Sequence, residues 1–271
     1  MNRRFDWVIE NARHVIEPRQ PGKKSDTEDA LAIVNRRGRP HLFITITMNA
    51  DWPEIRLNLQ PGQTAYDRPD LCARVFKIKL KEKIMKEIKS GKFFGPYDSH
   101  LCVIEWQKRG YPHAHCVFTF KGDGPDKLHE MDKWVLAGIP DENIANCVLR
   151  EKVLKYMIHR PCGATNVDAP CMQEDRGTKR KRCNKHFPQP FRASASINDK
   201  TGRVEYRRVN RRDSEKPTVR AKVNGVYKDV PIGDEWVASY NPWLLMRFDC
   251  HIHVHIVTAT ACIKYLFKYS H

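Results

Sequence analysis

Two adjacent runs of the chain constrain its fold most, because together they predict a β-hairpin. Residues 99–107 (SHLCVIEWQ) and 111–120 (YPHAHCVFTF) are rich in aromatic and β-branched side chains, which strands favour. The link at 108–110 ends in Gly110, which supplies the positive φ that a three-residue hairpin loop needs. A loop of this length places residue 105 directly opposite residue 113, so the sequence predicts the register of the hairpin.

Other segments predict a mixture of strands and helices. Residues 41–49 (HLFITITMN) have the composition of a strand. Residues 68–91 predict an amphipathic helix that ends at Gly91, because apolar side chains recur at spacings near three and four: Leu71, Val75, Ile78, Ile84 and Ile88. Further helices are expected over 126–138, 146–159 and 261–271, and further strands over 202–210, 218–231 and 248–259.

The overall charge of the chain indicates a polyanionic partner. Lys and Arg number 48 against 32 Asp and Glu, a net charge of +16, and nucleic acid is the simplest polyanion to bind such a surface. Two runs concentrate the charge, TKRKRC (178–183) and YRRVNRR (206–212). No apolar run is long enough to span a membrane, and the chain lacks a secretory signal and a GxxxxGK[ST] nucleotide loop.

His113 and His115 are candidate metal ligands. Side chains alternate along a strand, so both imidazoles face the same way and could share a cation. The hairpin register brings Glu105 opposite His113 as the expected third ligand, with Gln107 on the same face as the alternative. Such a set leaves positions open for a phosphate oxygen, as Lewis-acid chemistry requires. A His-x-His strand is a weak motif by itself, and a structural role for both histidines stays open.

Two further candidate functional groups, a histidine cluster and a tyrosine pair, lie near the C-terminus. The run DCHIHVHIV (249–257) places three histidines on one face and is, by periodicity alone, the better metal site: His251, His253 and His255. Tyr265 and Tyr269 are four residues apart, so on a helix they share a face, either as a packed aromatic stripe or as two phenolic nucleophiles. A phenol with a pKa near 10 would need a cation on the phosphate, and Lys268 is the expected phosphate contact.

The cysteines predict a second metal centre. The chain has nine cysteines and no sign of secretion, which favours thiols or metal ligands over disulfides. An H-x2-C-x8-C-x11-C pattern lies in an irregular segment, 159–195, that zinc would stabilise: His159, Cys162, Cys171 and Cys183. His186 is an alternative fourth ligand, and three buried or free thiols are the alternative to a zinc site.

Five stretches in order, spanning roughly residues 40–271, resemble the replication-initiator nuclease domain of Helitron transposases, a member of the HUH nucleases. They are LFITITMNADWPEI (42–55), DRPDLCARVFKIKL (67–80), VIEWQKRGYPHAH (103–115), RPCGATNVDAPC…CNKHFPQPF (160–191) and YNPWLLMRFDCHIHVH…IKYLFKY (240–269). The resemblance implies an α+β fold whose central antiparallel sheet is flanked by helices, with 1–40 as a helical or flexible extension and 41–271 as the nuclease domain.

The resemblance also implies a site and an activity. It favours the His113–His115 pair over the C-terminal histidines as the Mg²⁺ or Mn²⁺ site, with Glu105 the third ligand. It implies that Tyr265 or Tyr269 attacks a phosphodiester of single-stranded DNA, leaving a 5′-phosphotyrosine and a free 3′-hydroxyl. Two tyrosines permit two linked strand transfers, as rolling-circle-like transposition needs. The expected partners are transposon ends, target DNA and a helicase domain of the full-length protein, in the nucleus and without a membrane.

Contacts to the DNA backbone are expected from the basic runs and the hairpin loop: Arg109, Lys179, Arg180, Lys181, Arg182, Arg207, Arg208, Arg211 and Arg212. Stacking of bases has four candidates, for each of which core packing is the alternative role: Trp52, Trp106, Tyr111 and Phe187. Two other functions stay open at this stage. One is a zinc-stabilised single-stranded-DNA-binding module without catalysis, and the other is a metallo-phosphoesterase built on the C-terminal histidines.

Overall fold

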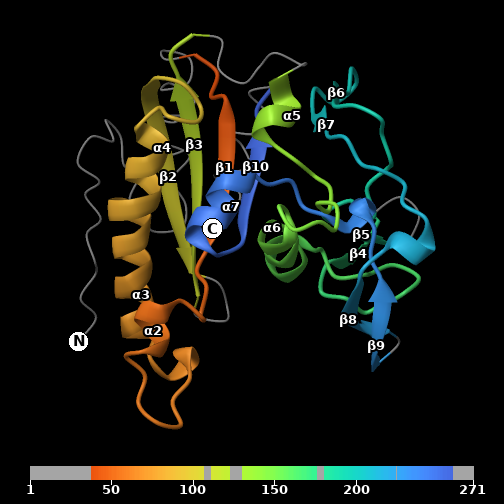
Figure 1. The fold of residues 1–271 in the computed structure, drawn as a ribbon, viewed down its shortest axis with the longest axis horizontal. Coiled ribbons are helices and arrows are strands. Elements are labelled where there is room, and N and C mark those ends of the chain that lie inside the picture. The colour runs from red at the N-terminus through yellow and green to blue at the C-terminus, as the bar shows by residue number, and fades with distance from the viewer. Residues whose placement is uncertain (1–37, 107–110, 123–129, 176–179, 224, 259–271) are drawn as a thin grey trace.

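The centre of the protein is a four-stranded antiparallel sheet. A computed structural model describes residues 38–106, 111–122, 130–175, 180–223 and 225–258. The strands lie in the order β10-β1-β3-β2 (Figure 1), with bounds β1 Leu42–Thr47, β2 Tyr97–Trp106, β3 Pro112–Phe120 and β10 Ile252–Ile256. Helices accompany this sheet, so the α+β prediction is confirmed.

The hairpin register follows the expectation from loop length. In the β2–β3 pair, Glu105 lies opposite His113 and Val103 lies opposite His115. On the other side of β3, strand β1 pairs Thr47 with His113. Since opposed residues of an antiparallel pair share a face of the sheet, these pairings decide which side chains meet.

One face of the sheet is apolar and packs against a long helix. Helix α3 (Pro69–Ile78) continues through a π-helical segment (Lys79–Met85) into α4 (Lys86–Lys89), as predicted for 68–91. Besides Met85, its buried side chains recur at every fourth residue: Cys72, Phe76, Leu80, Ile84 and Ile88. An α-helix would rotate such a row off the core, and the wider π turn compensates for that rotation. The expected core residue Ile78 is 54% exposed because it lies off this row.

The remaining elements are short and lie mostly beyond β10 (Figure 1). The helices are α2 (Pro53–Arg56), α5 (Met131–Trp134), α6 (Cys147–Lys152), which continues as a π turn (Val153–Met157), and α7 (Pro242–Phe248). The two-stranded ribbons are β4 (Met172–Glu174) with β5 (Lys181–Cys183), β6 (Ser196–Ile197) with β7 (Val204–Glu205), and β8 (Thr218–Val223) with β9 (Val226–Pro231). Single 3₁₀ turns cover Ala65–Asp67, Asp213–Glu215 and Asp234–Trp236.

The helix predicted at 146–159 is present, and the segment 218–231, predicted as a strand, forms the two strands β8 and β9. The strand predicted at 202–210 is shorter than expected, and residues 130–138 contain only the short helix α5. The helix predicted at 261–271 lies outside the described residues. Within the described residues, none of the helices is both long enough and apolar enough to pass through a bilayer.

Candidate active site and metal centre

The second face of the sheet carries the candidate ligands among a few apolar side chains such as Phe43 and Val103. Strand alternation turns one set of side chains to the helix and the other set to this face. The opposed pairs of the register place eight polar residues here: Glu105, His113, His115, Thr45, Thr47, His251, His253 and His255. The two histidine clusters of the sequence therefore occupy one continuous surface, with β1 between them.

The hydroxyl groups of Thr45 and Thr47 in β1 contact both histidines of β3. Thr47 Oγ1 lies 3.0 Å from His113 Nδ1, and Thr45 Oγ1 lies 3.1 Å from His115 Nδ1. A hydrogen bond at Nδ1 fixes the ring orientation and makes Nε2 the nitrogen that can bind a cation. Burial is the main cause that lowers the pKa of His113 to about 4, so this imidazole is neutral at pH 7, the form that binds metals.

Glu105 completes the set with a contact to one histidine. Its Oε2 atom lies 3.2 Å from Nε2 of His115, close to the roughly 3.0 Å that separates neighbouring ligands in an octahedron with bonds of about 2.1 Å. Burial lowers the pKa of His115, while Glu105 acts in the opposite direction. The donor chemistry fits a divalent cation, although Glu105, His113 and His115 are not among the groups of the described residues whose ligand atoms all approach within 4.8 Å.

The histidines around β10 already have hydroxyl partners. His251 Nδ1 lies 3.2 Å from Thr47 Oγ1, the hydroxyl that also contacts His113. His253 Nε2 lies 3.0 Å from Ser239 Oγ, and His255 Nδ1 lies 3.1 Å from Tyr206 Oη. His251, His253 and His255 share a face, as the spacing predicted. Within the described part of the chain, however, their ligand atoms do not form a group close enough to hold one metal ion.

The cysteine-rich segment brings together the four residues predicted to bind zinc. One ligand atom from each of His159, Cys162, Cys171 and Cys183 lies within 4.8 Å of all the others. His159 Nε2 is 3.7 Å from Cys162 Sγ and 3.5 Å from Cys183 Sγ. Tetrahedral zinc with bonds of about 2.3 Å to sulfur and 2.0–2.1 Å to nitrogen separates such atoms by about 3.6 Å, so the cluster has the right size. His186, the alternative ligand, is not part of this group.

Local structure explains how distant residues form this cluster. The β4–β5 ribbon pairs Met172 with Cys183, which brings Cys171 and Cys183 together across a loop. Burial raises the pKa of the Cys162 and Cys171 thiols. For Cys183, burial is outweighed by backbone N–H donors of Phe187 and Lys185, and its pKa is lowered. Donors of this kind stabilise a thiolate, the form that binds metals.

The predicted DNA contacts divide into exposed and structural residues. Arg180, Lys181, Arg182, Arg207 and Arg212 are exposed. Arg211 is mostly covered and pairs with Asp141 at 2.9 Å and with Asp234 at 3.5 Å. The exposed side chains can contact a phosphate backbone, whereas the guanidinium of Arg211 is already paired with carboxylates and has mainly a structural role.

Arg208 is a correction to the sequence-based prediction. Its side chain is buried, and Nη1 donates to the backbone carbonyls of Ala137 at 2.9 Å, Asp234 at 2.5 Å and Val237 at 2.7 Å. The guanidinium therefore binds two segments inside the protein, at residue 137 and at residues 234–237, and is not available to DNA. Burial lowers the pKa of Arg208 to about 10, so it remains charged at pH 7.

Replacing Arg208 with methionine is expected to destabilise the protein by about 3–5 kcal/mol, because three buried carbonyls lose their donor. Urea unfolding measures the change. Arg207→Met, one residue away on an exposed side chain, is the matched control and should change stability by less than about 0.5 kcal/mol. A loss below about 1 kcal/mol for the Arg208 variant would contradict its structural role.

The aromatic candidates also divide. Trp52 is only 1% exposed, and its Nε1 donates to the carbonyl of Phe248, so it is a core residue and not a stacking platform. Trp106 is 53% exposed. Tyr111 stacks on Tyr66 at 4.7 Å, and Phe187 stacks on His159 at 4.3 Å. Trp106 follows Glu105 at the end of β2, so strand alternation turns its side chain to the face opposite the histidines.

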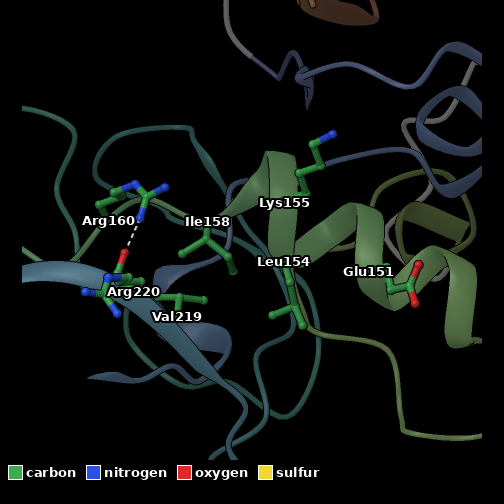
Figure 2. A pocket seen from close by; sticks show the side chains of 7 residues that line it. All are labelled: Glu151, Leu154, Lys155, Ile158, Arg160, Val219 and Arg220. Carbon is green, nitrogen blue, oxygen red and sulfur yellow. Dashed lines mark hydrogen bonds between the residues drawn. The ribbon is translucent and has the colours of Figure 1, made fainter. Parts of the chain in front are cut away.

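A pocket of about 440 Å³ lies between α6, its π-helical continuation and β8 (Figure 2). Its apolar lining is formed by Leu154, Ile158 and Val219. Three cations and one carboxylate complete it: Lys155, Arg160, Arg220 and Glu151. Lys155 also pairs at 3.3 Å with Asp51, shortly after the end of β1, so this pocket adjoins the end of the sheet that carries His113. The cations at this pocket suit contacts with phosphate, although none of its lining residues is aromatic.

Several predicted residues lie outside the described residues: Gln107, Arg109, Lys179, Tyr265, Lys268 and Tyr269.

The described part of the chain is thus an α+β domain that combines a histidine-lined sheet face with a separate Cys/His cluster. Residues 14–118 match the family model described as the Helitron helicase-like domain at N-terminus, the region of Helitron transposases that contains the HUH-type domain. The match covers less than half of the chain and confirms the resemblance found in the sequence. It indicates a transposase-type role and interaction with DNA in general terms. A search of curated proteins found no match.

Proposed function

We propose that the chain is a metal-dependent nickase and strand transferase for single-stranded DNA, acting in rolling-circle-like Helitron transposition. The observation that carries the proposal is that Glu105 of β2 and His113 and His115 of β3 lie on the same face of the sheet. Hydroxyl groups of two threonines orient both imidazoles. A nuclear location and a helicase elsewhere in the full-length protein belong to the same proposal.

The chemistry is a transfer of one phosphodiester. The phenolic oxygen of Tyr265 or Tyr269 bonds to phosphorus and loses its proton, the bond from phosphorus to the 3′ oxygen breaks, and that oxygen takes up a proton. The products are a 5′-phosphotyrosine and a 3′-hydroxyl, and attack by a 3′-hydroxyl reverses the step and joins strands. A divalent cation held by Glu105, His113 and His115 would supply Lewis-acid activation of the phosphate. Because imidazole is a poorer ligand for Mg²⁺ than for Mn²⁺, the donor set favours Mn²⁺.

Chain length permits the tyrosines to reach this face. Tyr265 follows the last residue of β10, Ile256, by nine positions, which can span at most about 30 Å at 3.3 Å per residue. His253, three residues before the end of β10, lies opposite Thr45, whose other neighbour is His115. To reach His115, the chain after Ile256 therefore needs to run back by only a few residues along β10. Lys268 would then lie near the tyrosines as a phosphate contact.

The path of the DNA follows the basic surface. The pocket beside α6 would receive nucleotides leaving the sheet face, and the exposed Lys181 and Arg182 of β5 would bind further phosphates.

The test uses labelled single-stranded DNA, Mn²⁺ and a denaturing gel. We expect a protein-linked DNA band that EDTA abolishes and that the double variant Tyr265→Phe/Tyr269→Phe does not form. Cleavage without a linked band would instead indicate a phosphoesterase that uses water.

A second candidate is a zinc-stabilised single-stranded-DNA-binding module without catalysis. The observation that favours it is the closed Cys/His cluster, which has the size of a zinc site, whereas the three acidic and histidine ligands are less tightly gathered. In that case the same assay would show DNA retained by the protein on a filter but neither cleavage nor a linked band.

A further inference from the structure

A stacked aromatic pair lies at the end of the sheet that carries His113. Tyr111 comes two residues before His113, which is at most about 7 Å along an extended chain. The ring of Tyr66 stacks on the ring of Tyr111, with centroids 4.7 Å apart and planes inclined by 25°. Helix α3, which begins shortly after Tyr66, starts at the same end of the molecule at which β2 finishes (Figure 1). The pair therefore adjoins the proposed metal site.

The two rings differ in how much of them the protein covers. Tyr111 is partly buried and packs against the core beneath α3. Tyr66 lies over Tyr111 from outside, and its side chain is 59% exposed. Since Tyr111 covers one side of the Tyr66 ring, the exposed area of Tyr66 includes the ring face that points away from Tyr111. This face is a flat aromatic surface that is open to a ligand.

The backbone that carries Tyr66 is fixed on both sides. The N–H and the hydroxyl of Thr64 both donate to Oδ2 of Asp67 at 2.8 Å, which closes the 3₁₀ turn around Tyr66. The thiol of Cys72 donates to the carbonyl of Ala65 at 3.3 Å, and both of these residues are buried. A ring held in this way loses little conformational freedom when a ligand binds to it.

The acidic side chains next to Tyr66 in the sequence already have partners. Asp67 accepts the two hydrogen bonds from Thr64. Asp70 accepts from both Nε and Nη2 of Arg68 at 2.9 Å. These carboxylates therefore repel a phosphate backbone less than isolated carboxylates would, and the chain as a whole has a net charge of +16 that attracts it.

We propose that Tyr66 is a stacking platform for an unpaired base of the DNA strand that is held at the metal site. This inference rests on the proposed nicking function and adds the contact that selects a single strand. Every base has a π-face, so stacking on an aromatic ring holds a single strand without reading its sequence. In a duplex the faces of the bases are covered by their neighbours, whereas the basic surface attracts both forms of DNA. Tyr66 therefore favours the unpaired strand.

The first measurement is the Kd for a labelled single strand in EDTA, where no nicking occurs. We expect Tyr66→Ala to raise the Kd by about fivefold or more, the effect of losing one stacked base. Tyr66→Phe keeps the ring and should stay within about twofold of the wild type. Tyr227→Ala is the matched control, because Tyr227 is 62% exposed but lies on β9. Its Kd and the melting temperatures of all variants should equal those of the wild type.

The second measurement separates stacking from other roles of the side chain. It uses an abasic strand, which has the same number of phosphates but no bases. We expect Tyr66→Ala to bind the abasic strand within about twofold of the wild type, so that the two changes are coupled as in a double-mutant cycle. A structural or electrostatic role of Tyr66 would instead weaken the binding of both strands equally, and that result would overturn the stacking contact.

The outcomes also separate this inference from the nicking function. A wild-type chain that binds no single strand overturns both. A wild-type chain that forms the protein-linked DNA band, with Tyr66→Ala binding both strands as the wild type does, overturns the role of Tyr66 alone. A loss that depends on the bases, in a chain that forms no linked band, supports the stacking contact and overturns the nickase.

Discussion

Replacing His113 with alanine is expected to lower the rate of Mn²⁺-dependent adduct formation by about 10³-fold or more. Lewis-acid activation is worth several kcal/mol, and about 4 kcal/mol corresponds to this factor. Affinity for single-stranded DNA should change by less than about threefold, because the basic surface supplies most of it. Gel analysis of the adduct and a filter-binding titration measure the two quantities on the same preparation.

His255→Asn is the control for this experiment. His255 lies on the same face, but its Nδ1 atom contacts Tyr206. It lies opposite Phe43 of β1, two residues along the strand from Thr45, which lies opposite His115. The control should nick at close to the wild-type rate. Normal nicking by His113→Ala together with loss of nicking by His255→Asn would move the catalytic centre to the β10 histidines.

Removal of zinc is expected to unfold the cysteine-rich segment. Structural zinc contributes about 10–16 kcal/mol in zinc-finger peptides, which equals or exceeds the total stability of a typical domain. The buried core of this segment is small: Cys162, Ala169 and Cys183. Cys171→Ser should therefore lose bound zinc, lower the melting temperature by more than about 10 °C and expose the segment to limited proteolysis.

Cys147→Ser serves as the matched control, because Cys147 is an exposed free cysteine outside the cluster. It should retain zinc and melt with the wild type. Unchanged melting of Cys171→Ser, or a wild-type chain that contains no zinc by metal analysis, would contradict the structural zinc site.

The sequence predicted those features that depend on local spacing. The link at 108–110 determined the pairing of Glu105 with His113, and the structure has that register. The spacing of the four zinc candidates was also sufficient, because a ribbon and one turn bring them together. The helix over 68–91 was found from its apolar repeat, although the π turn could not be foreseen. Ile78 is exposed because the buried row passes through Cys72 and Phe76 instead.

Features that depend on long-range pairing were not predictable. Periodicity placed each histidine cluster on one face of its own strand, but only the position of β1 between β3 and β10 shows that the faces coincide. Thr45 and Thr47 resembled ordinary strand residues, yet their hydroxyls contact the imidazoles. Arg208 belonged to a basic run that suggested an exposed surface, whereas three carbonyls from two distant segments surround it.

The apolar side of β1 controls the chemistry of its other side. Ile44 and Ile46 are fully buried against the helix, and they alternate with Thr45 and Thr47. A shift of this strand by one residue would exchange the two sets, so that isoleucines would meet the imidazoles and hydroxyls would enter the core. Hydrophobic packing thus selects the hydrogen-bond partners of His113, His115 and His251, and a core substitution that loosens β1 would disorder the ligands without touching them.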